Sequence, residues 1–150
     1  MLILDTDHLT AIDRASAPGE NLRRRLANQG DDFCTTIVWI GEQLRGLLAL
    51  YSSARSDDEI LEAYGRLSKK LGSFHDFRIL DWTAEAGANF HRLRRGKIRI
   101  GTMDLRIACI AIANDATLLS RNLRDFLKSA RPPRRGLALV SSPLIVHRPD

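Results

Sequence analysis

The sequence predicts an α/β fold, in which helices cover both faces of a short parallel β-sheet in three α/β/α layers. Short apolar segments alternate with longer helical segments along the chain, as in βαβ units. The first four residues, Met1–Leu4, are apolar without alternation, which is typical of a strand covered on both faces. We find no internal repeat and no boundary, so a single domain spanning residues 1–150 is expected.

Each expected element follows from local composition. Strands are predicted at 2–5, 33–37, 78–82, 116–120 and 137–140. Helices are predicted at 20–29, 40–53, 56–71, 83–95 and 103–114. Ser56 and Glu59 form a capping-box pattern at the start of the third helix, and Gly96 suits the end of the fourth. Thr102 is a candidate N-cap for the last helix, whose apolar residues lie on every face.

Composition limits the class of protein. The chain is 44% hydrophobic and 27% charged, which is typical of a globular domain. No apolar run reaches the roughly 18 residues that a membrane helix needs, so no membrane partner is expected. Cys34 and Cys109 lie in apolar surroundings and are expected to be buried thiols. This cysteine usage predicts a reducing compartment, the cytoplasm.

Two basic segments indicate a polyanionic partner. The segment HRLRRGKIR (91–99) holds five cations and no acid, and RNLRDFLKSARPPRR (121–135) holds six cations and one acid. Such clusters are often only solvated surface, but their number around one set of acids favours RNA or DNA binding. The cations that we expect along an RNA path are Arg92, Arg94, Arg95, Lys97, Arg99, Arg121 and Arg124.

Acidic side chains follow several of the predicted strands. Asp5 ends the first strand, Glu42 and Asp104 lie in the opening turns of two helices, and Asp125 follows the fourth strand with Asn122 before it. The carboxyl ends of parallel strands share one edge of the sheet, so these side chains are expected to converge there. For Asp5, Glu42 and Asp104 the alternative is a simple capping role at a helix start.

Carboxylates gathered at one edge repel one another, and a bound divalent cation usually neutralises this repulsion. Oxygen ligands favour Mg²⁺ or Mn²⁺ over zinc, and the four histidines show no metal-ligand spacing. A carboxylate-bound metal beside basic loops is suited to phosphodiester hydrolysis by an activated water. The chain has no glycine-rich phosphate loop and no nucleophile motif that would compete with this chemistry.

Four segments resemble a known family. They are LILDTDHL, TTIVWIGEQLRG, IGTMDLRIACIAIANDATLLSRNLRDF and the final LALV, in this order over nearly the whole chain. The sequence resembles the PIN-domain ribonucleases, specifically the VapC-type toxins of type II toxin–antitoxin modules.

This resemblance implies a PIN-like fold and a Mg²⁺- or Mn²⁺-dependent endoribonuclease. Asp5, Glu42 and Asp104 would be the acidic triad, and Asp125 or Asn122 the fourth polar position. Thr6 and Ser120 would lie at the rim of the site as hydroxyl donors. Position 7 is often Asn in the family and is Asp7 here. The resemblance also implies a homodimer and a cognate VapB-like antitoxin whose C-terminal segment occupies the active-site groove.

Two other functions are compatible with parts of the pattern. LILDTDHLT also resembles the haloacid-dehalogenase phosphatases, in which Asp5 would be the nucleophile, Asp7 the acid/base and Ser120 the hydroxyl. No suitably placed lysine or acidic pair follows Ser120 to complete that site. A non-catalytic, basic nucleic-acid-binding module is the other alternative, but such a protein gains nothing from acids that face a phosphate.

Overall fold

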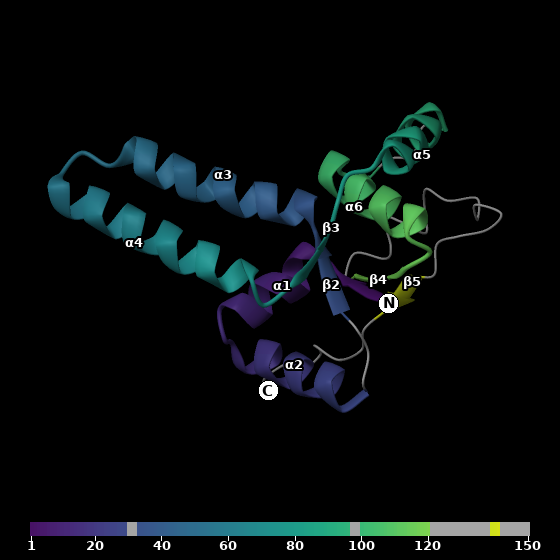
Figure 1. Cartoon of the computed structure of the whole chain (residues 1–150), viewed down its shortest axis with the longest axis horizontal. Helices are drawn as coiled ribbons and strands as arrows, with labels where there is room; N and C mark the ends of the chain where they lie inside the picture. Colours follow the sequence, from purple (N-terminus) through teal and green to yellow (C-terminus); the bar gives the residue numbers. More distant parts are fainter. Residues whose placement is uncertain (30–32, 97–99, 121–138, 142–150) are drawn as a thin grey trace, which may run out of the picture.

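The structure is a computed structural model that describes residues 1–29, 33–96, 100–120 and 139–141. Its strands are β1 (Leu2–Leu4), β2 (Phe33–Thr36), β3 (Arg78–Leu80), β4 (Thr117–Ser120) and β5 (Leu139–Ser141). They form one parallel five-stranded sheet in the order β3-β2-β1-β4-β5, with β1 at the centre (Figure 1). The predicted α/β fold with a short parallel sheet is therefore confirmed.

The described residues form six helices. They are α1 (Thr6–Asp13), α2 (Ala17–Gln29), α3 (Ile37–Ser53), α4 (Asp57–Phe74), α5 (Ala84–Arg95) and α6 (Thr102–Ala113). Helices α3 and α4 form a long antiparallel hairpin that projects away from the sheet (Figure 1). Within the described ranges, no helix is long and apolar enough to cross a membrane.

Each face of the sheet has its own core. Alternate residues of a strand point to opposite faces, so Ile3 and Leu118 contribute to one cluster while Leu4 and Leu119 contribute to the other. The first cluster lies under α5 and α6, and the second lies under α1, α2 and the sheet-proximal ends of α3 and α4. The sheet is therefore the middle of three layers.

Several predicted elements need correction. Strands β1 and β3 end earlier than predicted, at Leu4 and Leu80, while α2 begins earlier, at Ala17, and α4 continues to Phe74. Helix α1 was not predicted, although Asp5 caps it by accepting a hydrogen bond from the His8 backbone. Helix α3 begins at Ile37 and not at residue 40, because the Thr36 hydroxyl caps the Trp39 N–H and ends the strand there. Helix α6 begins at Thr102 itself, so Thr102 is not the N-cap that the sequence predicted. The N-cap is Gly101, which has no side chain to form a capping bond.

The predicted caps at Ser56 and Gly96 are confirmed, with the Glu59 bond of the capping box running to the residue before the N-cap. The Ser56 hydroxyl accepts from the Glu59 N–H at 3.3 Å, and the Glu59 carboxylate accepts from the backbone of Arg55. Gly96 is the C-cap of α5. Both Cys34 and Cys109 are buried thiols, as predicted, and burial raises the pKa of Cys109 to about 11.

Candidate active site

Asp5 stands where the central strand ends. Its backbone N–H donates to the Leu119 carbonyl at 3.1 Å, which continues the β1–β4 ladder by one residue. Its carboxylate oxygen Oδ1 accepts the His8 N–H at 3.0 Å and also contacts Nδ1 of the His8 ring. Asp5 is therefore the N-cap of α1, as the capping alternative expected, and a side chain at the carboxyl edge of the sheet.

The carboxyl group of Asp5 is held in its ionised form. Burial alone would raise its pKa, but the contacts with the His8 side chain and backbone oppose that effect. A hydrogen bond from the Ser120 side chain acts in the same direction, and the net pKa of Asp5 lies below its usual value of 3.8. Ser120 ends β4 and is almost fully buried, at 2% exposure. These contacts keep a negative charge at this edge of the sheet.

Glu42 is joined to the same edge by Thr6. The Thr6 hydroxyl, in the first turn of α1, donates to Oε2 of Glu42 on α3 at 3.3 Å. Because α3 begins at Ile37, Glu42 lies in its second turn and not in the opening turn that the sequence predicted. A capping role for Glu42 is therefore wrong, and its side chain is available to a site between α1 and α3.

Asp104 occupies the predicted place in the first turn of α6. Its side chain is half-buried. The carboxylate folds back over the start of the helix, since a Cβ atom added to Gly101 would lie 3.2 Å from Oδ2 of Asp104. The residue before it, Met103, lines a groove together with Gly41, the residue before Glu42. Asp104 therefore follows, on α6, a residue that lines this groove.

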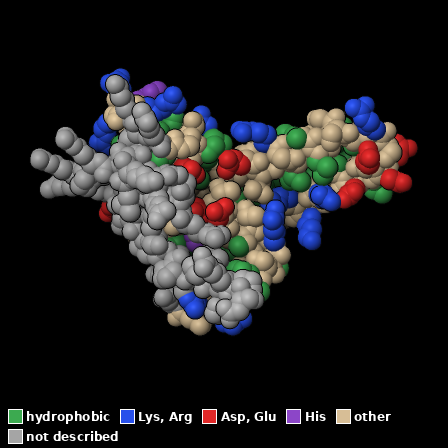
Figure 2. Space-filling view, turned by 180° about the vertical axis from the view of Figure 1, so that it is seen from behind, with side chains coloured by type: hydrophobic (Ala, Val, Ile, Leu, Met, Phe, Trp, Pro, Cys, Tyr) green, Lys and Arg blue, Asp and Glu red, His purple; other side chains and the backbone are tan. Residues whose placement is uncertain are grey.

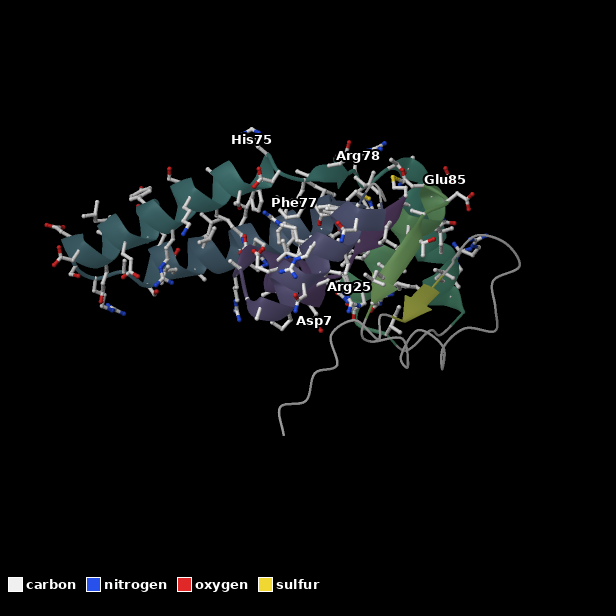
Figure 3. All side chains as sticks on the ribbon, turned by 90° about the horizontal axis from the view of Figure 1, so that it is seen from below. Asp7, Arg25, His75, Phe77, Arg78 and Glu85 are labelled. Carbon is white, nitrogen blue, oxygen red and sulfur yellow. The ribbon has the colours of Figure 1, made fainter. Side chains whose placement is uncertain are left out.

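The remaining predicted residues divide into two groups. Asp7 is exposed, on the side of the molecule formed by α1 and α2 (Figure 3). Arg92, Arg94 and Arg95 are exposed on the last turn of α5. The residues that lie outside the described part of the chain are Lys97, Arg99, Arg121, Asn122, Arg124 and Asp125.

The donor atoms of Asp5, Glu42 and Asp104 are all carboxylate oxygens, which is the chemistry that Mg²⁺ and Mn²⁺ prefer. Among the described residues, no three His, Cys, Asp or Glu side chains form a group that could hold a metal ion. The carboxylate chemistry fits Mg²⁺, which retains several waters and is bound through one or two carboxylates. It does not fit a closed cage such as a structural zinc site.

His8 is the residue that the sequence analysis missed. It lacks metal-ligand spacing and was interpreted as incidental, yet it is fully buried and contacts Asp5. A signal was present, because His8 follows the N-cap Asp5 by three residues. That spacing puts a side chain within reach of the cap.

A groove of about 490 Å³ adjoins the site between α3, α5 and α6. Its lining combines cations with aromatic and apolar side chains, namely Ile37, Val38, Gly41, Arg45, Trp82, Phe90, His91, Met103 and Arg106. The Arg106 guanidinium lies 5.8 Å from the Phe90 ring centroid. Trp82 is 40% exposed in this groove.

One face of the molecule carries acidic side chains at its middle and basic side chains, Lys and Arg, around them (Figure 2). A negatively charged centre with cationic surroundings suits a ligand whose phosphates are held outside the carboxylates.

No family model and no curated protein sequence matches the chain. Solved structures do match it over nearly their whole length. The chain is similar to VapBC2 from Rickettsia felis bound to a promoter DNA fragment, with 23% identity, 94% of this chain and 98% of that chain covered, and a TM-score of 0.65.

Two further structures give the same result. DNA-bound VapBC from Salmonella typhimurium matches with 19% identity, coverage of 93% and 96%, and a TM-score of 0.67. A toxin–antitoxin complex from Klebsiella pneumoniae matches with 15% identity, coverage of 92% and 96%, and a TM-score of 0.62. The chain therefore has the fold of chains found in VapBC and other toxin–antitoxin complexes, which is the PIN-like fold that its motifs predict.

Proposed function

We propose that this chain is a Mg²⁺- or Mn²⁺-dependent endoribonuclease and the toxin of a toxin–antitoxin pair. The observation that carries the proposal is the polar cluster at the carboxyl edge of the sheet. There Asp5 is kept ionised by His8 and Ser120, and Glu42 is held by Thr6. We propose that Asp104, on α6, joins them, together with Asp125 or Asn122, which lie outside the described residues.

Asp5, Glu42 and Asp104 would hold the cation, with Asp125 or Asn122 as the fourth polar side chain. When bound, a divalent ion at such a site lowers the pKa of a water ligand and neutralises charge on the phosphate. The chain supplies carboxylates, of which Asp5 is held ionised, and the hydroxyls of Thr6 and Ser120 orient Glu42 and Asp5 respectively. Arginines on α5 and around the groove would hold the RNA backbone.

The proposed partners follow from the similar structures. Those proteins occur as VapBC or toxin–antitoxin complexes, which supports a VapB-like antitoxin as the partner of this chain. We also propose a homodimer, in the cytoplasm, as the family resemblance implies. The antitoxin would inhibit cleavage by placing its C-terminal segment in the active-site groove.

Cleavage of total RNA tests the proposal. With Mg²⁺, the purified protein is expected to cut RNA and leave 5′-phosphate and 3′-hydroxyl ends, because a water is the nucleophile. Asp5→Asn and Asp104→Asn are each expected to abolish cleavage while cooperative thermal unfolding persists. Asp7→Asn is the matched control: it removes one exposed carboxylate next to the site and is expected to leave most activity intact.

Several outcomes would contradict the proposal. Cleavage that survives excess chelator, or products with a 2′,3′-cyclic phosphate, would exclude the metal-activated water. Hydrolysis of a small phosphomonoester without RNA cleavage would favour the haloacid-dehalogenase alternative. RNA binding without cleavage in any divalent metal would favour the non-catalytic binding module.

A further inference from the structure

His8 is a polar side chain in a place that usually holds an apolar one. It has 0% exposure, and its neighbour Leu9 belongs to the hydrophobic cluster that covers one face of the sheet. Histidine is only moderately common in fully buried positions, and its ring nitrogens need hydrogen-bond partners there. The ring nitrogen Nδ1 has such a partner in Oδ1 of Asp5.

Capping of α1 does not require this imidazole. The capping bond runs from the backbone N–H of His8 to Oδ1 of Asp5, and any residue except proline at position 8 could donate it. The ring contact is an additional bond to the same oxygen atom. The ring therefore restrains the Asp5 carboxylate beyond what the helix start needs.

Packing alone does not account for the imidazole either. The other ring nitrogen, Nε2, is buried and has no hydrogen-bond partner among the described residues. A leucine would fill a similar volume without burying an unpaired polar atom. Burial of Nε2 at this position therefore costs stability. What histidine adds over leucine is the Nδ1 contact to Asp5.

Taken with the proposed function, on which this inference rests, these contacts define a role. We propose that His8 is a positioning residue: its Nδ1 atom holds Oδ1 of Asp5, so that the carboxylate is presented to the divalent cation in one orientation. His8 itself does not bind the cation. Hydrogen-bond partners of metal-binding carboxylates commonly change metal affinity by about 10- to 100-fold when they are removed.

Three substitutions separate this role from a structural one. Asparagine can place an amide nitrogen near the position of Nδ1, whereas glutamine places it near Nε2, and leucine provides neither. The measurement is Mn²⁺ affinity by isothermal titration calorimetry on the full chain at a temperature where each variant is folded. His75→Asn, at the exposed C-cap of α4, is the matched control for loss of a histidine.

The expected result is rescue by asparagine alone. His8→Asn should bind Mn²⁺ within about threefold of the unmodified protein, and His8→Gln and His8→Leu should bind about tenfold or more weakly. His75→Asn should bind normally. Equal affinity in all three His8 variants would overturn the inference, and so would a loss in His8→Asn as large as that in His8→Leu.

Asp5→Asn distinguishes failure of the inference from failure of the proposed function. If the unmodified protein binds Mn²⁺ and Asp5→Asn does not, the proposed metal site is supported. The His8 variants then test whether His8 positions Asp5. If the unmodified protein binds no Mn²⁺, or Asp5→Asn binds it equally well, both the metal site and the positioning role of His8 are wrong.

Discussion

At the scale of single residues, the capping role of Asp5 is compatible with the metal-binding role proposed for it. Asp5 caps α1, and its lowered pKa keeps the carboxyl group in the charged form that the proposed site needs. The backbone N–H and the ring of His8 favour its ionised form, as the helix dipole also does. The same groups that begin the helix thereby keep a negative charge at the place where the proposed metal site needs one.

The lowered pKa of Asp5 predicts how stability depends on pH. A carboxyl whose pKa is lower in the folded state binds fewer protons there, so it stabilises the fold above its unfolded pKa of about 3.8. This contribution is lost as the pH falls through the lower, folded pKa. In chelator, the free energy of unfolding should therefore fall more steeply below pH 3.8 for the unmodified protein than for Asp5→Asn. Parallel curves from urea unfolding at each pH would contradict this.

The Thr6 hydroxyl gives a second prediction at the same scale. Its bond to Glu42 joins α1 to α3 at 3.3 Å, and the side chains of both residues are half-buried. Thr6→Val keeps the shape and removes the donor, so unfolding should become easier by about 0.5–1.5 kcal/mol. Metal affinity should also fall, because Glu42 is less well oriented. Thr6→Ser, which keeps the hydroxyl, should retain that affinity, and equal behaviour of the two variants would remove Thr6 from the site.

At the scale of helices, two glycines are predicted to respond to alanine in opposite ways. A Cβ on Gly19 of α2 would lie 2.0 Å from the Ala11 carbonyl oxygen of α1, and backbone cannot move aside as a flexible side chain can. Gly19→Ala should therefore destabilise the fold by at least about 1–3 kcal/mol. Gly65, inside α4, has nothing within 4 Å of a Cβ, so Gly65→Ala should stabilise by about 0.5–1 kcal/mol.

Chemical unfolding of the two variants beside the unmodified protein checks this pair. Equal and small effects would mean that α1 and α2 are not packed as closely as the structure describes.

The helices also show where sequence patterns stop being sufficient. Helix α1 has eight residues, too few for a clear helical period, so its polar start was interpreted only as a possible turn or cap. The residues Ile37–Trp39 are apolar and were in part assigned to the preceding strand. The boundary is decided by the Thr36 cap and the tertiary contacts of Trp39 with Phe74 and Phe77, which no local pattern contains.

The candidate site was easier to predict than its supporting contacts. Asp5, Thr6 and Ser120 are placed by the ends of parallel strands, a rule that applies before any coordinates exist. The bonds that orient them depend on which helix packs beside which. The Thr6–Glu42 bond spans 36 residues, and the second turn of α3 rather than the first carries Glu42. Local sequence contains neither fact.

At the scale of the whole molecule, the sheet separates two basic surfaces. Helix α5 lies over one face with Arg94 and Arg95 exposed in its last turn, and α2 lies over the other face with Arg23 and Arg24 exposed (Figure 1). Only the α5 side adjoins the groove beside the candidate site. The proposed RNA path therefore predicts that these two pairs of arginines are not equivalent.

Salt dependence of RNA binding provides the measurement. Each phosphate contact to a single strand contributes about 0.7 to the slope of log affinity against log salt, so losing two contacts should reduce the slope by about 1.4. We expect this reduction when Arg94 and Arg95 are both changed to Gln, measured with single-stranded RNA in chelator, so that nothing is cut. Changing Arg23 and Arg24 to Gln removes the same charge from the opposite face and should leave the slope unchanged. If both double variants lower the slope equally, RNA responds to net charge alone; if neither does, α5 is solvated surface and the RNA follows another path.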